Sequence, residues 1–437
     1  MRVVFVSQEM PPETGWGGIG TYVDVISEAL AARGLDVHVL SVADGQPAGR
    51  QERHGVVVHR YPLPALHRPS RYAPESWRRL LVTVSVARLI GRLGHAPDVV
   101  ECPEWMAEGL ALGVRGRLPL VVRLHSTARQ LFAFTGQGRA GRGLDGRLAA
   151  RLEETSARLA NVVVSTRANL EEVTGWMRLD PRALHAIPYP VRLPPLAPLE
   201  EGAPPRVTFV GRLEPRKGPE VVLRAAPRVL AEVPDARFVF VGRDVVAPGE
   251  PPSTQWLRRE AQRLGIDHAV ELTGQLDRGG VQEQLRRATV CAFPSRWESF
   301  GNAIAEASAV GRPVVVSPIP AFRDVVADGV TGEMVGLDDT AGWAAALTSL
   351  LVDRVRARAM GEAGARHVAG ISDPGRVAEL ALAAHEHARE RWRRGERAGA
   401  GRGSWRGGRA AREDTARGDA ARGRAARGHA ERGRAGT

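Results

Sequence analysis

Short apolar runs alternate with amphipathic segments along most of the chain. In the N-terminal half the apolar runs predict strands, and the segments between them have the spacing of helices. The predicted strands are Val3–Ser7, Val37–Val42, Val56–Tyr61, Asp98–Cys102, Leu118–Leu124 and Val162–Ser165, and the predicted helices are Thr21–Arg33, Glu75–Leu93, Glu104–Leu112, Arg147–Leu159 and Ala168–Trp176. Strands that are apolar throughout and alternate with helices indicate a parallel sheet covered on both faces.

A proline-rich stretch interrupts this alternation. Seven prolines fall between Pro188 and Pro205, too many for a helix or a central strand, so the stretch is predicted to be a linker. The alternation then restarts, with predicted strands Val207–Val210, Arg237–Val241, Val270–Thr273, Val290–Phe293 and Val314–Ser317, and predicted helices Pro219–Val229, Gln255–Leu264, Gly280–Arg287, Asn302–Val310, Ala341–Leu351, Arg354–His367 and Pro374–Arg391.

These patterns predict an α/β protein of two doubly wound, Rossmann-like domains that face each other across a cleft. The expected parts are an N-terminal domain at 1–187, the linker at 188–205, a C-terminal domain at 206–370, a helix at 371–394 that packs back on the N-terminal domain, and a tail at 395–437. Open parallel sheets bind ligands at the carboxyl ends of their strands, so we expect the chemistry in the cleft.

Most of the positive charge lies in the tail. The net charge is +12, yet residues 391–437 hold 14 Arg against 5 acidic residues, whereas residues 1–390 hold 47 basic and 44 acidic residues. This Arg/Gly/Ala segment has almost nothing to bury, so we expect it to be disordered. Beyond Trp392 its one aromatic residue is Trp405, which disfavours a specific nucleic-acid partner; a peripheral contact with an anionic membrane surface stays open.

The sequence has no pattern typical of a signal peptide and no apolar run long enough to span a bilayer, so we expect a cytoplasmic protein. Cys102 and Cys291 fall in different halves of the chain, which favours buried, reduced thiols over a disulfide or a zinc site. Asp338 and Asp339 precede a predicted helix and are expected to cap it rather than bind a metal. Nothing in the chain indicates an oligomeric state.

A glycine-rich loop follows the first predicted strand. Residues 15–20 read Gly-Trp-Gly-Gly-Ile-Gly and fit the dinucleotide-binding fingerprint, with Asp36 further on as its acid. Seven residues separate the strand from the first glycine, whereas the true fingerprint turns directly off the strand. We therefore expect a flexible loop that opens onto the cleft and lets backbone approach a ligand. An NAD(P)-dependent oxidoreductase is the alternative that this loop keeps open.

A pair of cations follows the first strand of the C-terminal half. Arg212 and Lys217 lie five residues apart between a predicted strand and the helix that starts at Pro219. Lys217 is the single lysine among 61 basic residues, which invites a chemical reason for its retention. An Arg fork and a compact Lys ammonium can together hold both phosphates of a diphosphate. The alternative is a solvated basic loop.

Two carboxylates follow another strand of the same half. Glu298 lies in the loop after Phe293, and Glu306 lies inside the helix that begins near Gly301. Carboxylates accept hydrogen bonds from sugar hydroxyls, and the amides of Ser299–Asn302 are donors at a positive helix end. The alternative assigns Glu306 to a helix surface and Glu298 to a cap. Because both glutamates face the Arg212 and Lys217 loop, we favour a binding site.

Together these motifs resemble those of the family-4 (group 1) retaining glycosyltransferases of the GT-B fold, over about residues 1–390. The matching pieces are Gly17-Gly18, Gly-Arg-Leu…Lys-Gly at 211–218, Pro-Ser-x-x-Glu-Ser-Phe-Gly at 294–301, the Glu-x7-Glu pair and Gly311-x-Pro313-Val-Val-Val-Ser317. The resemblance implies transfer of a hexose-type sugar from a nucleotide-diphosphate sugar, with retention and without an obligatory metal or cofactor. The acceptor is not implied.

The resemblance also implies roles for individual residues. Arg212 and Lys217 would bind the diphosphate and stabilise it as leaving group, Glu306 would bind the ribose, and Glu298 the transferred sugar. Amides of Phe300, Gly301 and Asn302 would contact donor hydroxyls or phosphate, and Gly18 would approach the phosphate and acceptor. His125 matches the family's cleft histidine near the reacting sugar; taken alone it would be a structural histidine at a strand end.

Two stretches depart from the family's pattern. The usual Asn-Gly-Val-Asp before the hinge is Tyr189-Pro190-Val191-Arg192, and the usual His-Ala-His-Asp is replaced at residues 101–104 by Glu-Cys-Pro-Glu, followed by Trp105. Both changes lie on the acceptor side or at the hinge. The resemblance therefore specifies the donor side more firmly than the acceptor side.

Overall fold

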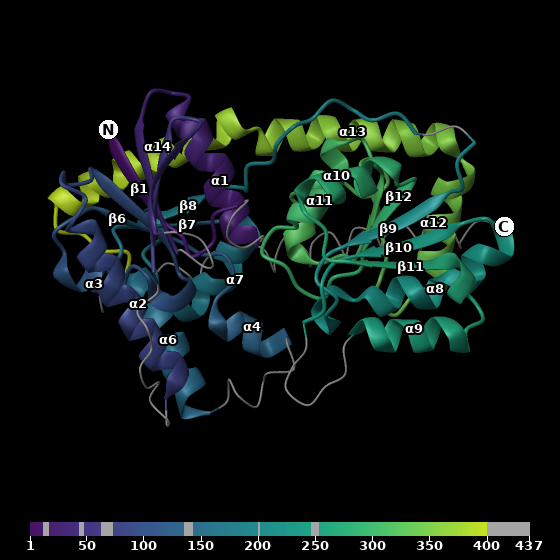
Figure 1. Ribbon diagram of the computed structural model, residues 1–437, viewed down its shortest axis with the longest axis horizontal. Helices are drawn as coiled ribbons and strands as arrows, with labels where there is room; N and C mark the ends of the chain where they lie inside the picture. The colour runs from purple at the N-terminus through teal and green to yellow at the C-terminus, as the bar shows by residue number, and fades with distance from the viewer. Residues whose placement is uncertain are drawn as a thin grey trace, which may run out of the picture.

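The structure is a computed structural model that describes residues 1–11, 17–42, 48–62, 73–134, 143–199, 202–245 and 253–399. These residues form two α/β bodies, each built on its own sheet (Figure 1). The chain passes from the first body to the second through residues 187–199, an extended segment without helix or strand. The predicted α/β class and the pair of Rossmann-like sheets are confirmed.

The N-terminal sheet has eight strands in the order β3-β4-β2-β1-β5-β6-β7-β8. All neighbours are parallel except β3 and β4, which pair antiparallel. The strands are β1 (Arg2–Val6), β2 (Asp36–Val42), β3 (Gly49–Arg53), β4 (Val56–Tyr61), β5 (Val99–Pro103), β6 (Leu120–Arg123), β7 (Val162–Ser165) and β8 (Leu184–Ala186). The central strands are buried along their whole length, as parallel strands covered on both faces must be.

Helices cover both faces of this sheet. They are α1 (Gly18–Ala31), α2 (Pro74–Ile90), α3 (Leu110–Arg115), α4 (Ala128–Phe134), α6 (Leu144–Leu159) and α7 (Arg167–Met177), with 3₁₀ turns η1 (Trp105–Ala107) and η2 (Pro181–Ala183). α2 and α6 are fastened at their N-terminal ends, where Asp145 accepts hydrogen bonds from the backbone N–H groups of Glu75 and Ser76 at 2.9 and 3.0 Å.

The C-terminal sheet has six parallel strands in the order β11-β10-β9-β12-β13-β14. The strands are β9 (Arg206–Val210), β10 (Arg237–Val241), β11 (Val270–Gly274), β12 (Val290–Phe293), β13 (Val314–Val316) and β14 (Glu333–Met334). The helices are α8 (Pro219–Glu232), α9 (Ser253–Arg263), α10 (Arg278–Arg287), α11 (Asn302–Ala309), α12 (Thr340–Val352) and α13 (Arg354–Ser372), with 3₁₀ turns at Pro215–Lys217, Asp267–Ala269 and Pro320–Phe322.

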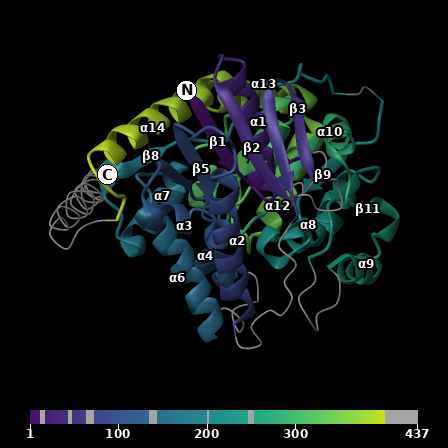
Figure 2. The same ribbon diagram turned by 60° about the vertical axis from the view of Figure 1, so that its left-hand side comes forward.

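The last helix returns to the N-terminal body. α14 (Pro374–Arg393) continues from α13 and runs beside the N-terminal sheet (Figures 1 and 2). Its His385 lies 2.6 Å from Glu101 of β5, and Trp392 Nε1 donates to the carbonyl of Gly116 at 2.9 Å. Both bodies are therefore tied together by two crossings of the chain, the extended linker and this helix.

The ordered chain extends beyond the predicted start of the tail at residue 395. Ala398 is buried, its N–H donates to the carbonyl of Ala160, and its own carbonyl accepts from Asp180 N–H, both at 2.7 Å. The expectation that the tail begins at 395 is wrong by five residues, because these backbone bonds add the segment to the N-terminal body. The remaining predicted tail, 400–437, lies outside the described residues.

This boundary gives a stability prediction. A chain ending at Gly399 keeps the backbone bonds of Ala398, whereas a chain ending at Arg394 loses them together with the ion pair of Arg391 and Glu396. Since a hydrogen bond contributes about 1 kcal/mol net, the shorter chain should lose about 2–3 kcal/mol of unfolding free energy. Urea unfolding of both truncations and of the full chain measures this. Equal midpoints for the two truncations would contradict it.

Two predicted helix boundaries need correction. The helix expected at Glu104–Leu112 is instead η1 followed by α3, because Met106 and Ala107 have positive φ angles of 58° and 52° that an α-helix cannot contain. α1 begins at Gly18 rather than Thr21, so Gly18 and Gly20 form a first helical turn and not a flexible loop. Residues 12–16 of the predicted loop lie outside the described residues.

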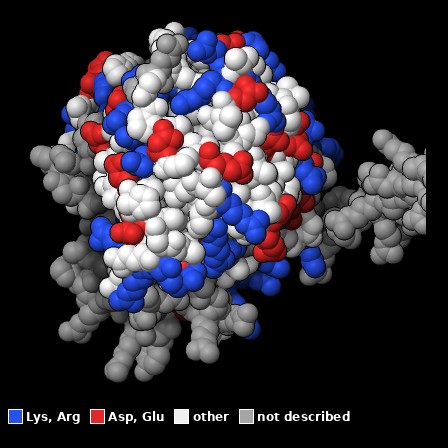
Figure 3. All heavy atoms as spheres, turned by 90° about the vertical axis from the view of Figure 1, so that its right-hand side faces the viewer, with Lys and Arg blue, Asp and Glu red and all other residues white. Residues whose placement is uncertain are grey.

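The cysteines and the cap of α12 agree with the sequence, whereas three strands are additional to those predicted. Cys102 and Cys291 are buried free thiols, and Asp339 caps α12 by accepting a hydrogen bond from Gly342 N–H at 2.7 Å, both as predicted. β3, β8 and β14 were not predicted. On the outer face of the C-terminal body, Arg side chains lie interspersed with Asp and Glu (Figure 3), in keeping with the near balance of charge over residues 1–390. No helix of the described chain is long and apolar enough to cross a membrane.

Candidate active site

The two predicted cations lie on the loop that connects β9 to α8. Arg212 follows the strand, and Lys217 ends the 3₁₀ turn that begins at Pro215. The Arg212 side chain is 43% exposed and that of Lys217 is 19% exposed. Arg212 Nη2 lies 3.2 Å from Glu214 Oε1, so most of its fork stays open to a ligand. The loop therefore offers one accessible guanidinium and one largely buried ammonium.

Gly218 brings this loop against the loop after β12. It has a φ of +67°, and a Cβ at this position would lie 2.2 Å from the carbonyl oxygen of Pro294. The N–H of Arg296 also donates to the carbonyl of Arg216 at 2.8 Å. The segment that carries Lys217 and the segment that carries Glu298 are thus in direct contact, and only glycine allows so close an approach.

This contact can be tested with a matched pair of glycines. Gly265 has nearly the same φ, +69°, but its Cβ direction is open to solvent. Gly265→Ala should cost about 1–2 kcal/mol from backbone strain alone. Gly218→Ala adds the clash with Pro294, and should cost at least about 2 kcal/mol more. Unfolding in urea gives both values, and equal losses would show that the loops are not held by this contact.

Glu298 lies at the centre of an ion-pair group. Its Oε1 atom accepts from Lys217 Nζ and, at 3.2 Å, from Ser295 Oγ; its Oε2 atom lies 3.3 Å from Arg216 Nη1. Arg216 in turn pairs with Glu214 at 2.6 Å and donates to the carbonyl of Trp297 at 2.9 Å. The carboxylate therefore fixes both basic residues that precede α8 in position.

The charges in this group are set by their mutual contacts. Burial acts to raise the pKa of Glu298, but Lys217 and Arg216 outweigh it and hold that pKa below its ordinary value. Burial also lowers the pKa of Lys217, and Glu298 opposes this effect. The carboxylate is ionised at neutral pH and sustains the ammonium beside it. A polyanionic ligand arriving here would meet Arg212 and Lys217, while Arg216 stays buried among Glu214, Glu298 and the Trp297 carbonyl.

Glu306 lies on α11 and lines a cavity between the two bodies. Asn302, Arg278 and Tyr189 line the same cavity. Burial raises the pKa of Glu306, while Arg278 and Lys217 act against that rise. The positive charges of Arg278 and Lys217 therefore favour the ionised form of the Glu306 carboxyl.

The N-terminus of α11 meets the N-terminus of α1. Gly301 caps α11 with a φ of +110°, and its first turn leaves backbone N–H groups without helical partners. Gly18, the first residue of α1, faces this turn: a Cβ at Gly18 would lie 3.2 Å from Asn302 Nδ2. Two positive helix ends therefore converge, which favours negative charge between them.

His125 is buried directly after β6. Its backbone N–H donates to both carboxyl oxygens of Glu104 at 2.8 Å, and its Nδ1 atom lies 2.5 Å from the Tyr189 hydroxyl. Burial and the charge of Arg123 lower the pKa of His125 well below its ordinary value. The imidazole is neutral at physiological pH, so it can donate or accept a hydrogen bond but carries no charge.

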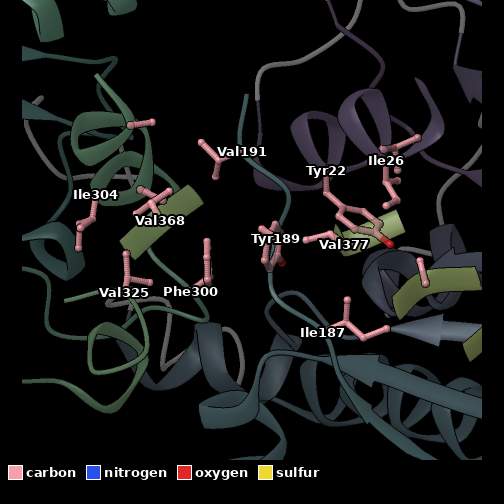
Figure 4. Packing of buried hydrophobic residues seen from close by; sticks show 14 of the residues in the cluster. Tyr22, Ile26, Ile187, Tyr189, Val191, Phe300, Ile304, Val325, Val368 and Val377 are labelled. Atoms are coloured by element: carbon pink, nitrogen blue, oxygen red, sulfur yellow. The ribbon is translucent and has the colours of Figure 1, made fainter. Parts of the chain in front are cut away.

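The loop that carries Glu298 also contacts the N-terminal body. Trp297 Nε1 donates to Glu172 at 2.9 Å, and Thr166 Oγ1 donates to the carbonyl of Ser299 at 2.5 Å. Phe300 stacks on Tyr189 with ring centroids 5.2 Å apart. Figure 4 shows Tyr189 between Tyr22 on one side and Phe300 on the other. The loop that carries Glu298, residues 294–301, is therefore built into the interface of the two bodies.

The structure brings the predicted site residues to facing edges of the two sheets. Arg212, Lys217, Glu298 and Glu306 gather in the C-terminal body, Gly18 and Asn302 approach each other across the interface, and His125 reaches Phe300 through Tyr189. The sequence patterns did not indicate a role for Arg216, for Arg123 or for the contacts of Tyr189. The position of Arg216 beside Lys217 was a usable signal, whereas Arg123 resembles any other strand-end arginine.

Two facing Rossmann-like domains with a cation loop and a Glu-x7-Glu pair on the second domain define the GT-B class of transferases. The model for the glycosyl transferase 4-like domain matches residues 17–190, and the model for glycosyl transferases group 1 matches residues 204–353. The D-inositol 3-phosphate glycosyltransferase of Xylanimonas cellulosilytica is 31% identical over 84% of this chain and 91% of its own.

Solved structures agree with the fold. Sucrose-phosphate synthase from Thermosynechococcus elongatus superposes with a TM-score of 0.72, at 21% identity, over 88% of this chain and 98% of that one. Anabaena Alr3699/HepE, solved in complex with UDP and glucose, gives a TM-score of 0.64 at 17% identity over 87% of this chain and 98% of its own. The chain belongs to the family-4 (group 1) glycosyltransferases and has their GT-B fold.

Proposed function

We propose that this glycosyltransferase moves a hexose-type sugar from a nucleotide-diphosphate sugar to an acceptor that the site does not identify. One observation carries the proposal: the single lysine of the chain is buried against Glu298 on the loop that also carries Arg212. A solvated basic loop would give no reason for this arrangement. The similarity to HepE, which was solved with UDP and glucose bound, and to D-inositol 3-phosphate glycosyltransferases supports the donor class.

On the donor side, each group has a chemical task. The ribose hydroxyls of the nucleotide would donate to the Glu306 carboxylate, and the diphosphate would bind Arg212 through its fork and Lys217 as a point charge. The N–H groups of Phe300, Gly301 and Asn302 at the start of α11 would meet phosphate or sugar oxygens. Glu298 would accept hydrogen bonds from hydroxyls of the transferred sugar.

Sugar transfer breaks the bond between the anomeric carbon and the diphosphate oxygen, so negative charge grows on the diphosphate. Arg212 and Lys217 stabilise that charge, and preorganised cations in a site that excludes water contribute strongly to the rate. His125 would contact the reacting sugar from the opposite domain. Retention of anomeric configuration follows the family likeness and stays a prediction, as does independence of a metal or cofactor.

The oxidoreductase alternative and the expectations on localisation and on single residues stand differently. The oxidoreductase alternative loses its support, because the chain belongs to a glycosyltransferase family. A cytoplasmic site of action, with the 400–437 segment contacting anionic membrane by charge, is proposed from sequence alone. The same holds for the roles of the individual site residues and for the division of the chain at 187 and 205.

A donor screen tests the proposed function directly. Thermal unfolding is followed with UDP-, ADP- and GDP-sugars and with NADH at equal concentrations, and the stabilising donor is then incubated with cell extract for product analysis. We expect one nucleotide sugar to raise Tm and NADH to leave it unchanged, since a ligand stabilises only the state that binds it. Stabilisation by NADH alone would overturn the proposal.

A further inference from the structure

The two stretches that depart from the family's pattern meet at one histidine. Tyr189 belongs to the departure before the hinge, and Glu104 belongs to the departure at the end of β5. Tyr189 contacts the imidazole of His125 through its hydroxyl, and Glu104 holds the backbone N–H groups of His125 and Ser126. The departure before the hinge and the departure on the acceptor side therefore both contact the same residue, His125.

Tyr189 joins the two domains at this histidine. Its ring is buried and stacks on Phe300, in the loop that carries Glu298, with an interplanar angle of 19° (Figure 4). Its hydroxyl lies 2.5 Å from His125 Nδ1. The Arg123 guanidinium lies over the rings of Tyr22 and Tyr189, with its central carbon 3.9 and 4.7 Å from their centroids. One side chain thus contacts both the donor loop and the histidine.

Hydrogen-bonding capacity determines which atom holds the proton. Burial raises the pKa of Tyr189 to about 12, so the phenol keeps its hydrogen. Among the residues that the structure describes, His125 Nδ1 is the hydrogen-bond partner of the Tyr189 hydroxyl, and a buried O–H donor needs an acceptor. The phenol hydrogen is therefore donated to Nδ1 of the neutral imidazole. A neutral imidazole has a single N–H, which must be on Nε2.

Nε2 is the free end of this arrangement. Across the part of the chain that the structure describes, no hydrogen bond is formed by His125 Nε2, whereas Nδ1 and the backbone N–H are both engaged. An oxygen of a bound sugar is an acceptor of the right kind for that N–H. The groups that face His125 are Tyr22 from α1, Glu104 from the end of β5, Arg123 from β6 and Tyr189.

We propose that Tyr189 is a positioning residue that fixes His125 as the Nε2–H tautomer and, through Phe300, couples that proton donor to the donor-binding loop. The inference rests on the proposed function, since it assumes that a sugar occupies the space between His125 and the donor loop. It assigns to Tyr189 a role in the transfer step that is separate from the choice of acceptor.

The surrounding network supplies a matched control. Tyr22 is also buried and packs edge-on against His125 with centroids 5.6 Å apart, but its hydroxyl donates to Glu101 Oε1 at 2.7 Å. Glu101 pairs with His385 of α14 through its other oxygen. Tyr22→Phe therefore removes one buried hydrogen bond from the same aromatic group, as Tyr189→Phe does, without touching a nitrogen of His125.

The tautomer is measured by long-range ¹H–¹⁵N correlation spectra of the full chain with ¹⁵N-labelled histidine, and the His125 signals are assigned by their loss in His125→Gln. We expect wild type and Tyr22→Phe to carry the hydrogen on Nε2, and Tyr189→Phe to show a mixture of tautomers. A wild-type hydrogen on Nδ1 would overturn the proposal, even if a variant failed to fold.

Kinetics with the donor found by the screen give the second measurement. Tyr189→Phe keeps the stacking ring, so the donor KM should change less than about twofold. The variant loses the hydroxyl that orients His125, so kcat should fall about 10- to 100-fold. Losses of this size are typical when the group that orients a functional histidine is removed, as is known for the histidines of metal sites. Tyr189→Asn, the residue typical of the family, loses the stack as well and should also raise the donor KM. Equal losses of kcat in Tyr189→Phe and Tyr22→Phe would overturn the proposal.

These two measurements separate the inference from the proposed function. The spectra report the tautomer in the absence of any substrate, whereas transfer by the wild-type chain tests the function alone. An active wild type with an Nδ1–H tautomer would refute the role of Tyr189 and leave the proposed function standing. Absence of any donor or product would refute the proposed function whatever the tautomer.

Discussion

Lys217→Ala is expected to lower the rate of sugar transfer by at least about 100-fold, the size typical when one preorganised group that stabilises a developing negative charge is removed. The variant should also bind the donor more weakly, because Lys217 is proposed to contact the diphosphate in the ground state as well. Steady-state product formation with the donor from the screen, together with a direct binding titration, measures both losses.

The local contacts indicate that this variant will fold. Glu298 keeps Arg216 at 3.3 Å and Ser295 at 3.2 Å when the ammonium is removed, so its charge is not left unpaired. Lys217→Arg is the informative companion: it restores the charge, but its planar head must fit where the compact ammonium contacts Glu298, so we expect partial activity. Full activity in Lys217→Ala, with unfolding unchanged, would contradict the assignment.

Glu306→Ala is expected to weaken donor binding by at least about 100-fold. Hydrogen bonds to a charged group contribute about 1.5–3 kcal/mol each, and the carboxylate is proposed to accept two from the ribose. A nucleotide lacking the ribose hydroxyls provides the control: it should bind wild type and variant equally. If the variant discriminates the two nucleotides as strongly as wild type, the ribose contact is wrong.

The same residue gives a pH dependence. Burial raises the pKa of Glu306 above its ordinary value, with Arg278 and Lys217 opposing, and only the ionised carboxylate accepts both hydroxyls. Donor affinity should therefore be complete above that raised pKa and fall as the pH drops through it. Glu306→Gln cannot ionise, so its weaker binding should be flat over the same range, as titrations at several pH values would show.

Much of the fold was predictable because its strands are simple. Most strands of both sheets contain a run of apolar residues, such as the three valines of β7 and of β13, and this pattern is typical of parallel strands covered on both faces. The predicted helix at Glu104–Leu112 failed because the chain there follows tertiary demands: Glu104 must reach the N–H groups of His125 and Ser126, and Met106 and Ala107 adopt positive φ angles. Residues 395–399 were assigned to the tail because their composition resembles that of the tail. Their packing against the N-terminal body cannot be inferred from composition.

The candidate site divides in the same way. Lys217 could be selected because it is the one lysine in an arginine-rich chain, and the Glu298–Glu306 spacing is visible in sequence. The joint role of Tyr189 and Glu104 could not be predicted from the sequence, because the two residues are 85 positions apart and meet only through His125. A departure from a family pattern marks where to look, but its meaning depends on which side chains the fold brings together.

The central claim is that Arg212 and Lys217 bind the diphosphate of the donor, and a titration series tests it most directly. The nucleoside diphosphate and monophosphate of the base selected by the screen are titrated into wild type and Lys217→Ala. We expect wild type to prefer the diphosphate by at least about tenfold, equivalent to 1.4 kcal/mol, and the variant to lose most of that preference. An equal preference in both proteins would contradict it.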